Sequence, residues 1–274
     1  MQVYRDLYAL TARPDAEELA RAPHHLFGHV DAAERHSAGR WMKEAGAQIA
    51  ELRRREQVPV LVGGTGLYLQ ALVEGLSDIP EIDQAPRIEA RRLIAKDIAS
   101  AYARLREVDP EAAARIDPAD RQRIARALEV WLATGRAISS YRGQAAPVLA
   151  EGEWLGVALT PARETLYERL NARVDAMMKA GALDEARALW ARALDPELPA
   201  MRAHGMPGFG EHIAGRLSLA EAVERCKRDT RRYAKRQLTW IAHQFTLWPR
   251  IPAGSQDLRV KVVGALMREI EAAA

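Results

Sequence analysis

A glycine-rich turn at residues 63–66 (Gly-Gly-Thr-Gly) is the first place where the sequence could bind a ligand. It follows the short apolar run 57–62 (QVPVLV), which is typical of a buried parallel strand, and precedes a helical pattern from Leu67. In open α/β sheets, ligands bind at this end of a strand, where glycines admit them to the backbone and the helix N-terminus favours anions. Thr65 adds a hydroxyl that can donate and accept, although it also suits the N-cap of a plain strand–helix turn. No lysine follows the glycines, and the chain contains no G-x-x-x-x-G-K-[ST] loop.

Two arginine-bearing helical segments could bind a phosphate or a nucleobase. Residues 120–126 (DRQRIAR) place Gln122, Arg123 and Arg126 near an expected helix start. A glutamine can hydrogen-bond a base edge, and an arginine can stack on a base or bind a phosphate. Arg173 lies on a later helix, where an inward-facing guanidinium could bind a diphosphate bidentately. Both patterns are also common on solvated helix faces, and the residues alone favour that interpretation.

The strongest cationic signal is the segment 225–236 (RCKRDTRRYAKR), in which Asp229 is the single acidic residue. At helical spacing, Ala234, Leu238 and Ile241 form an apolar stripe. The basic side chains on the other faces are Arg228, Arg232, Lys235 and Arg236. So dense a cationic helix repels itself, which favours binding to a polyanion over an ordinary solvated face.

Histidine and cysteine usage gives no sign of a metal site. His24, His25, His29 and His36 fall close together in the sequence, but no cysteine accompanies them and their spacing matches no zinc motif. We therefore predict no metal ligands among them. Cys226 is the single cysteine, so an intrachain disulfide is excluded, and we expect a small buried residue there.

The composition is that of a globular protein, since 48% of the 274 residues are hydrophobic and 28% are charged. This length can bury a substantial core and corresponds to one large or two smaller domains. No apolar run approaches the roughly 20 residues that span a bilayer, and the first residues carry no export signal. We therefore predict a cytoplasmic protein with no membrane partner. A net charge of +3 is by itself weak evidence for a nucleic acid partner.

The order of elements predicts an α/β core interrupted by a helical insertion. The sequence predicts a helix over about 38–56, followed by the apolar run, the glycine turn and another helix. This order is typical of an α/β fold, and a second strand is expected at 153–159. Between these parts strand signals vanish and Arg, Ala, Glu and Leu dominate. We predict the first part of the core at 1–79, an all-helical insertion at 80–143, and the second part of the core, with the basic helix, at 144–274.

Local signals predict where several helices begin. Asp117 and Pro118 indicate a helix start, with aspartate as the N-cap and proline in the first turn. Thr160 and Glu164 resemble a capping box at the start of a long helix. Residues 205–208 (GMPG) predict a turn before the basic helix.

Motifs along the whole chain resemble those of the tRNA dimethylallyltransferase family. The order and spacing of these motifs, rather than any single one, make the resemblance specific. They are residues 1–5 (MQVYR), like the end of the family's D-S-x-Q-x-Y, 11–14 (TARP), like its T-A-K-P, 23–26 (PHHL), 61–68 (LVGGTGLY), 122–130 (QRIARALEV) and 233–240 (YAKRQLTW). The match at 23–26 explains the histidine pair without a metal.

The resemblance implies a P-loop-type parallel-sheet core and an all-helical insertion that clamps the tRNA anticodon stem-loop. It implies transfer of a dimethylallyl group from dimethylallyl diphosphate to the exocyclic amine of the adenosine 3′ of the anticodon, by a monomer. Mg²⁺ would assist the leaving diphosphate. The adenosine would have to leave its stack to reach the prenyl donor.

The resemblance also implies roles for individual residues. Thr65 resembles the threonine that meets the target base, and Arg173 resembles an arginine that binds the diphosphate and stabilises charge on the leaving group. These two are the expected catalytic residues. The expected tRNA contacts are Gln2, Thr65, Arg87, Gln122, Arg123, Arg126, Arg202, Lys235 and Arg236.

Two departures from the family pattern carry further expectations. After residues 202–205 (RAHG) the family has Tyr-Arg, where this chain has Met206 and Pro207. The family's first strand, phosphate-binding loop and catalytic aspartate would precede Met1, so we expect upstream in-frame coding sequence for them. We also expect the 274-residue chain alone to pack loosely and to lack transfer activity, because unpaired buried backbone groups are costly.

Two other functions compete with this one. A non-catalytic tRNA-binding remnant would keep the helical clamp and lack the chemistry. A small-molecule phosphotransferase would share the core, but it would have no use for the Gln/Arg segment of the insertion or for the basic helix.

Overall fold

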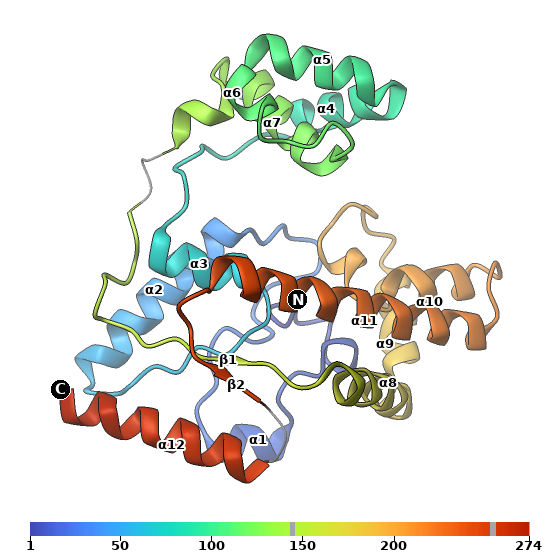
Figure 1. Cartoon of the computed structure of the whole chain (residues 1–274). Coiled ribbons are helices and arrows are strands. Elements are labelled where there is room, and N and C mark those ends of the chain that lie inside the picture. Colours follow the sequence, from blue (N-terminus) through green and yellow to red (C-terminus); the bar gives the residue numbers. More distant parts are fainter. Residues whose placement is uncertain (143–145, 253–255, 274) are drawn as a thin grey trace. The chain divides into compact units, whose positions relative to one another are not determined.

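The computed structural model describes residues 1–142, 146–252 and 256–273 (Figure 1). They form two compact units, one made of Met1–Leu72 with Leu149–Ala274 and the other of Val73–Val148. The predicted insertion, 80–143, lies within the second unit. Among the described residues, no helix combines the length and the apolar character needed to cross a bilayer.

Helices account for most of the described chain. The α-helices are α1 (Ala16–Arg21), α2 (Ala38–Arg54), α3 (Gly66–Glu74), α4 (Gln84–Lys96), α5 (Ile98–Val108), α6 (Pro110–Ala113), α7 (Arg121–Thr134), α8 (Arg163–Lys179), α9 (Ala182–Ala191), α10 (Met206–Ile213), α11 (Leu219–Gln244) and α12 (Gln256–Ala273). Short 3-10 helices are η1 (Ala9–Thr11), η2 (Ile138–Tyr141) and η3 (Ala200–Arg202). Helices α2 and α3 confirm the helices predicted on either side of the apolar run.

A small parallel sheet makes the first unit α/β. Strands β1 (Ala158–Leu159) and β2 (Arg250–Ile251) pair in parallel, with Ala158 opposite Arg250 and Leu159 opposite Ile251. Tyr4 and Val30 form a separate parallel bridge. The predicted α/β class is therefore confirmed in its coarse form, a mostly helical protein with a small parallel sheet.

The predicted strand at 57–62 is wrong for the described structure. None of these residues is in a strand, and Val60 and Val62 are 65% and 87% exposed. A strand is defined by backbone pairing, and no described segment forms a ladder with this run. The strand predicted at 153–159 is reduced to Ala158–Leu159 for the same reason, since β2 pairs with these two residues alone.

The core of the first unit joins the N-terminal segment to the later helices. Tyr4 is 1% exposed and packs in one cluster with Val174 of α8, Leu189 of α9 and Phe209 of α10. Cys226 of α11 belongs to the same cluster at 2% exposure, which confirms the prediction of a small buried residue. Burial of such side chains contributes roughly 1.5–3 kcal/mol each.

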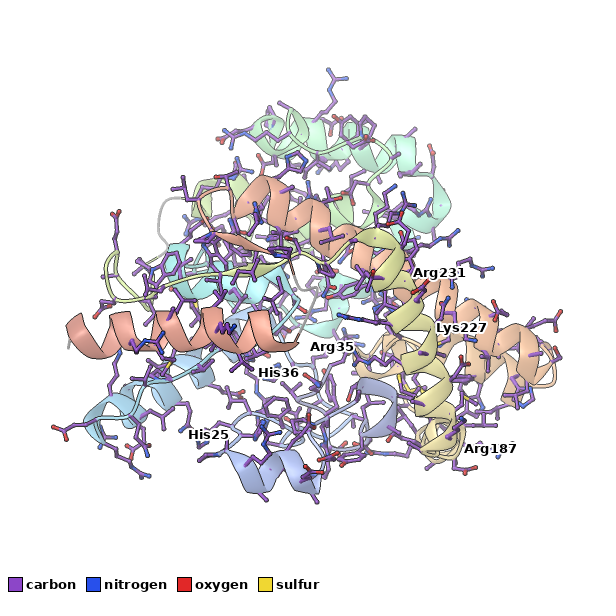
Figure 2. All side chains as sticks on the ribbon, turned by 60° about the horizontal axis from the view of Figure 1, so that its bottom comes forward. His25, Arg35, His36, Arg187, Lys227 and Arg231 are labelled. Carbon is purple, nitrogen blue, oxygen red and sulfur yellow. The ribbon has the colours of Figure 1, made fainter. Side chains whose placement is uncertain are left out.

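Polar contacts hold α11 beside α8. The Lys227 ammonium lies 2.7 Å from a carboxylate oxygen of Asp175, and Arg231 donates to the Asn171 amide oxygen at 2.5 Å. Figure 2 shows Lys227 and Arg231 beside α8. Two of the basic side chains of α11 are therefore used within the fold.

The second unit is a helical bundle of α4, α5, α6 and α7. Leu105 of α5 and Ile124 and Leu128 of α7 are fully buried in its core. Asp109, 2% exposed, accepts hydrogen bonds from the backbone N–H of Ala112 and of Ser139, each at 2.9 Å. This carboxylate therefore caps α6 and fixes the start of η2.

Two predicted helix starts are wrong. Helix α7 begins after Asp120, whose carboxylate accepts from the Arg123 backbone N–H at 3.0 Å, while Asp117 caps only a preceding turn. Helix α8 begins at Arg163 with Ala162 as N-cap and no side-chain cap, so Thr160 forms no capping box. Each segment offers several capping residues close together, and tertiary packing decides which one is used.

The turn predicted at 205–208 is also wrong in part. Helix α10 begins at Met206, and Pro207 lies in its first turn, where a missing backbone N–H costs nothing. Gly205 precedes it at φ +97, a conformation that favours glycine.

Shortening a buried leucine of the second unit should destabilise the protein strongly. We expect Leu128→Ala to lower the free energy of unfolding by about 2–5 kcal/mol, because it leaves a cavity in a packed core. Ile88 of the same unit is 57% exposed, so Ile88→Ala serves as the control and should cost less than about 0.5 kcal/mol. Urea titrations followed by circular dichroism compare the two. Equal losses would show that the Leu128 site is not a packed core.

Candidate functional site

The glycine turn at 63–66 packs directly on α11. The Gln237 side-chain amide donates to the carbonyl oxygen of Gly64 at 2.8 Å. A Cβ atom at Gly64 would lie 1.9 Å from Gln237 Nε2, and one at Gly66 would lie 2.1 Å from the Trp240 ring. A side chain at Gly66 would displace the Trp240 ring and one at Gly64 would displace the end of the Gln237 side chain, so both glycines favour close approach of the turn to the helix.

Thr65 lies exposed at the tip of this turn, beside an aromatic residue of α11. Its hydroxyl oxygen is 3.1 Å from the hydroxyl oxygen of Tyr233, and either group can donate. The Tyr233 ring contacts the His204 imidazole, with ring centroids 4.6 Å apart. The Arg236 guanidinium lies 5.5 Å from the Tyr233 ring centroid, a cation–π distance. These four side chains join a hydroxyl, an aromatic face and a cation in one place.

Burial lowers the pKa of His204, and the nearby positive charge of Arg236 lowers it further, as does that of Arg173. The imidazole is therefore neutral near pH 7. A neutral imidazole adds no charge to a site that already has two guanidinium groups.

Arg173 and Gln2 converge on one backbone segment. Arg173 Nη2 donates to the carbonyl oxygen of Thr11 at 3.0 Å. Gln2 Nε2 donates to the carbonyl oxygens of Thr11 and Ala12 at 3.2 and 3.0 Å. The backbone carbonyls fix both side chains, and Arg173 remains exposed, so it can meet an anion without first losing a carboxylate partner.

The basic side chains of α11 have different environments. Arg225, Arg228 and Arg232 all lie 3.8–4.0 Å from a carboxylate oxygen of Asp229. Lys235 and Arg236 are exposed, and neither forms an ion pair with another described residue. Exposed cations without a carboxylate partner are the ones best able to bind a phosphate.

Arg202, the other tRNA-contact residue predicted in this unit, is exposed and forms an ion pair with Glu197. A phosphate would have to compete with that carboxylate. Its position therefore offers less to an anion than those of Lys235 and Arg236.

The second unit presents its predicted residues on and near α7 and α4. Gln122 and Arg123 are exposed in the first turn of α7. Arg123 is paired with Asp120 and Arg126 with Glu129, each at 3.4 Å. Arg87 is part-buried and donates from Nε to the Ile82 carbonyl oxygen at 3.0 Å. Arg87 therefore supports the start of α4. Gln122 is open to a ligand, while a phosphate at Arg123 would have to compete with Asp120.

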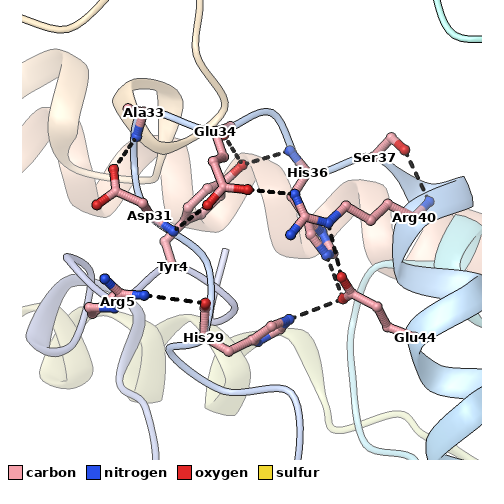
Figure 3. A network of polar contacts seen from close by, with 10 residues as sticks. All are labelled: Tyr4, Arg5, His29, Asp31, Ala33, Glu34, His36, Ser37, Arg40 and Glu44. Atoms are coloured by element: carbon pink, nitrogen blue, oxygen red, sulfur yellow. Dashed lines mark hydrogen bonds and ion pairs between the residues drawn. The ribbon is translucent and has the colours of Figure 1, made fainter.

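A second polar cluster brings together His29, His36 and Glu44 (Figure 3). One oxygen of Glu44, Oε2, lies 3.0 Å from His29 Nε2 and 2.9 Å from His36 Nε2. The other oxygen accepts from Arg40 Nε at 2.9 Å. The sequence prediction considered both histidines but missed Glu44, because the carboxylate lies on α2 and only the fold brings it to them.

The protonation states in this cluster follow from burial and hydrogen bonding. Burial raises the pKa of Glu44, but hydrogen bonds from His36, His29 and Arg40 outweigh it and lower the pKa to about 2. Burial lowers the pKa of His36, whose side chain is 1% exposed. The His36–Glu44 contact is therefore a hydrogen bond from a neutral imidazole to a carboxylate rather than an ion pair.

Sequence reasoning missed four residues that build the site around Thr65: His204, Tyr233, Gln237 and Trp240. Three of them stand in the segment 233–240, but only its cations were assigned roles. A tyrosine, a glutamine and a tryptophan at positions i, i+4 and i+7 share one helix face, and that spacing was the available signal.

Comparison with known proteins finds a family and relatives whose names agree with one another. The family described as "IPP transferase" matches residues 2–244. A tRNA dimethylallyltransferase of Hyphomonas neptunium is 51% identical over 275 residues, covering 100% of this chain and 87% of the relative. One of Maricaulis maris is 48% identical over 268 residues, covering 97% of this chain and 87% of the relative.

Solved structures that resemble this chain carry names of the same kind. The tRNA isopentenylpyrophosphate transferase of Bacillus halodurans superposes with a TM-score of 0.67 at 32% identity, over 98% of this chain and 84% of its own. A eukaryotic dimethylallyltransferase acting on tRNA superposes with a TM-score of 0.69 at 30% identity, over 88% of this chain and 61% of its own. The likeness covers both units.

The lowered pKa of His204 predicts how stability depends on pH. The folded protein binds this proton less readily than the unfolded chain, whose histidine has a pKa of 6.5. Above pH 6.5 the imidazole is neutral in both states and costs the folded state nothing. As the pH falls through 6.5 toward the folded-state pKa, the unfolded chain takes up the proton first and the free energy of unfolding decreases. When the pH is lowered from about 7.5 to about 5.5, we expect the free energy of unfolding to decrease less in His204→Gln than in the wild type. Urea midpoints measured at both pH values test this, and an equal loss in both proteins would contradict it.

Proposed function

Because the chain belongs to the IPP transferase family, we propose that it transfers a dimethylallyl group from dimethylallyl diphosphate to tRNA. The acceptor is the exocyclic amine of the adenosine 3′ of the anticodon. The observation that carries this proposal is the docking of the glycine turn on α11, which holds the Thr65 hydroxyl 3.1 Å from Tyr233. A nucleobase can hydrogen-bond to that hydroxyl while an aromatic ring and cations lie beside it.

In the proposed reaction the amine nitrogen forms a bond to the first carbon of the dimethylallyl group as the bond from that carbon to the diphosphate breaks. The electron pair of the broken bond goes to the diphosphate, and the proton that the amine loses passes to water or to an oxygen of the released diphosphate. Thr65 orients the base by hydrogen bonding. Arg173, exposed and fixed on the Thr11 carbonyl at 3.0 Å, stabilises the charge that develops on the leaving diphosphate.

Mg²⁺ belongs to the proposal as an ion that arrives with the diphosphate. It would supply further neutralisation of charge on the phosphate oxygens. Among the described residues, the group of histidine and acidic side chains that could hold a metal ion is His29, His36 and Glu44, which lies apart from the proposed reaction centre. No step above is therefore assigned to it.

Each unit contributes to tRNA binding in this proposal. Lys235 and Arg236 of α11 bind phosphates of the anticodon stem-loop, and Gln122 and Arg123 of α7 contact it from the second unit. Intramolecular partners are already bound by Arg123, Arg126, Arg87, Gln2 and Arg202. These residues therefore support the binding surfaces or exchange partners on binding. We further propose that the core is of P-loop type and that the protein acts as a monomer in the cytoplasm.

Removing the side chains at the proposed reaction centre should slow transfer. In a protein extended by the upstream in-frame sequence, we expect Thr65→Ala and Arg173→Ala each to reduce the single-turnover rate by a factor of about 10² to 10³, equivalent to about 2.7–4 kcal/mol in the barrier. Thr65→Ser keeps the hydroxyl and should retain most of the rate. Single-turnover transfer to an anticodon stem-loop RNA measures this, with Thr134→Ala and Arg187→Ala as controls in which a helix-surface threonine and an ion-paired arginine are lost.

Rates within twofold of wild type in both reaction-centre variants would contradict the assigned roles. Measuring RNA binding in the same samples separates the alternatives. Tight RNA binding with no transfer in the extended protein without substitutions would favour a non-catalytic tRNA-binding protein over an enzyme.

Binding of tRNA should weaken steeply with salt, and the exposed cations of α11 should carry part of that dependence. Each phosphate contact contributes roughly −0.7 to −0.9 to the slope of log affinity against log salt. The double variant Lys235→Ala, Arg236→Ala should flatten the slope by about 1 to 2. The control pair Arg187→Ala, Arg216→Ala removes two arginines already bound to carboxylates and should leave the slope near wild type. A slope unchanged in the α11 variant would show that these cations form only a solvated face.

A further inference from the structure

The His29, His36 and Glu44 cluster lies outside the proposed reaction centre, and the transfer reaction assigns it no role. Its three candidate ligand atoms lie within 4.8 Å of one another. Two imidazole nitrogens face the same carboxylate oxygen at 2.9 and 3.0 Å. Around a tetrahedral zinc ion, bonds of about 2.0 Å place neighbouring ligand atoms about 3.3 Å apart, so small side-chain rotations would admit an ion.

We infer that His29, His36 and Glu44 form a binding site for a divalent transition metal such as Zn²⁺. Two imidazoles and one carboxylate are a donor set that suits zinc, cobalt or nickel rather than magnesium or calcium, which prefer oxygen. Three protein ligands leave a fourth position for water. The ion ties the segment that contains His29 and His36 to α2.

The surroundings hold the three ligands in place without the ion. The backbone N–H of His36 donates to the Tyr4 hydroxyl at 3.2 Å, and Tyr4 is itself fully buried. Arg40 binds the other oxygen of Glu44 and leaves Oε2 directed at the imidazoles. Such partners orient the ligands of a metal and fix their geometry. Figure 3 shows this network around the three side chains.

The charges nearby permit a cation. The positive side chain of Arg40 contacts Glu44 at 2.9 Å, but it also binds Glu34 at 2.8 Å. The guanidinium is therefore balanced by two carboxylates, and the three groups together carry a net negative charge. The side chains of His29 and Glu44 are 33% and 26% exposed, which gives an ion a route from solvent.

Metal binding requires each Nε2 to offer a lone pair, so the ring proton must lie on Nδ1 in the metal-bound form. Nδ1 of His36 is buried and has no hydrogen-bond partner among the described residues. It can take the proton, but an unpaired buried donor weakens the site. We therefore expect an affinity of the order of micromolar rather than the far tighter binding of closed cysteine sites.

Titration with Co²⁺ and Zn²⁺ tests the site directly. The purified protein is treated with a chelator, desalted and titrated with Co²⁺, which absorbs strongly in the visible range when four-coordinate. We expect one Co²⁺ per chain, displaced by one Zn²⁺, and a higher unfolding temperature with Zn²⁺. His29→Gln should weaken binding by at least about tenfold, the scale on which even an outer partner matters.

The control is the double variant His24→Gln, His25→Gln. His24 Nδ1 lies 2.8 Å from the Ala22 carbonyl oxygen and belongs to no ligand group among the described residues, so this variant should bind one ion as wild type does. If His36→Gln fails to fold, His29→Gln and Glu44→Gln still test the site, because both side chains are partly exposed. The absence of one-to-one binding in the wild type, equal binding in His29→Gln, or loss of binding in the control would each overturn the assignment.

Discussion

The close approach of the glycine turn to α11 is the contact on which the candidate reaction centre depends. It brings together residues 173 positions apart in sequence, through the hydrogen bond from Gln237 to the Gly64 carbonyl at 2.8 Å. The approach has no room for a Cβ atom at Gly64 or Gly66 without displacing Gln237 or Trp240. Thr65, set between these glycines, is thereby fixed against Tyr233. The turn is thus built for contact with α11, and the position of the one reactive hydroxyl follows from that contact.

The same helix divides its charged side chains between folding and binding. Lys227 and Arg231 face α8 and bind Asp175 and Asn171. Further along, Lys235 and Arg236 are exposed and form no ion pair with a described residue. The like charges of a cationic helix repel one another. Around Lys227 and Arg231 this repulsion is offset by partners from α8, whereas Lys235 and Arg236 keep their charge available for a ligand. A polyanion that binds Lys235 and Arg236 would reduce the repulsion between them.

Features of the fold that depend on residues near one another in sequence could be predicted, whereas features that depend on contacts formed only in the fold could not. The α2 and α3 helices and the buried position of Cys226 follow from local periodicity and composition, and the structure confirms them. The family follows from the order of motifs. The start of α7 at Asp120 rather than Asp117 was not predictable, because both aspartates are good caps and both accept backbone hydrogen bonds. The contact of Tyr233 with Thr65 depends on packing between distant segments. The contacts of Glu44 depend on how the segment before α2 folds back onto that helix.

The segment 57–62 shows where such reasoning ends. Its β-branched, apolar sequence is suited to a buried strand, yet Val62 is 87% exposed and no described segment pairs with it. Suitability for a strand is a property of the residues themselves, whereas pairing and burial are properties of what lies beside them. The His29–His36–Glu44 cluster shows the converse. Neither histidine spacing nor composition marked it, and three ordinary residues became a candidate ligand set only because the fold placed α2 beside the segment that carries the histidines. Sequence patterns therefore identify which residues can do chemistry, and the contacts between distant segments decide which of them act together.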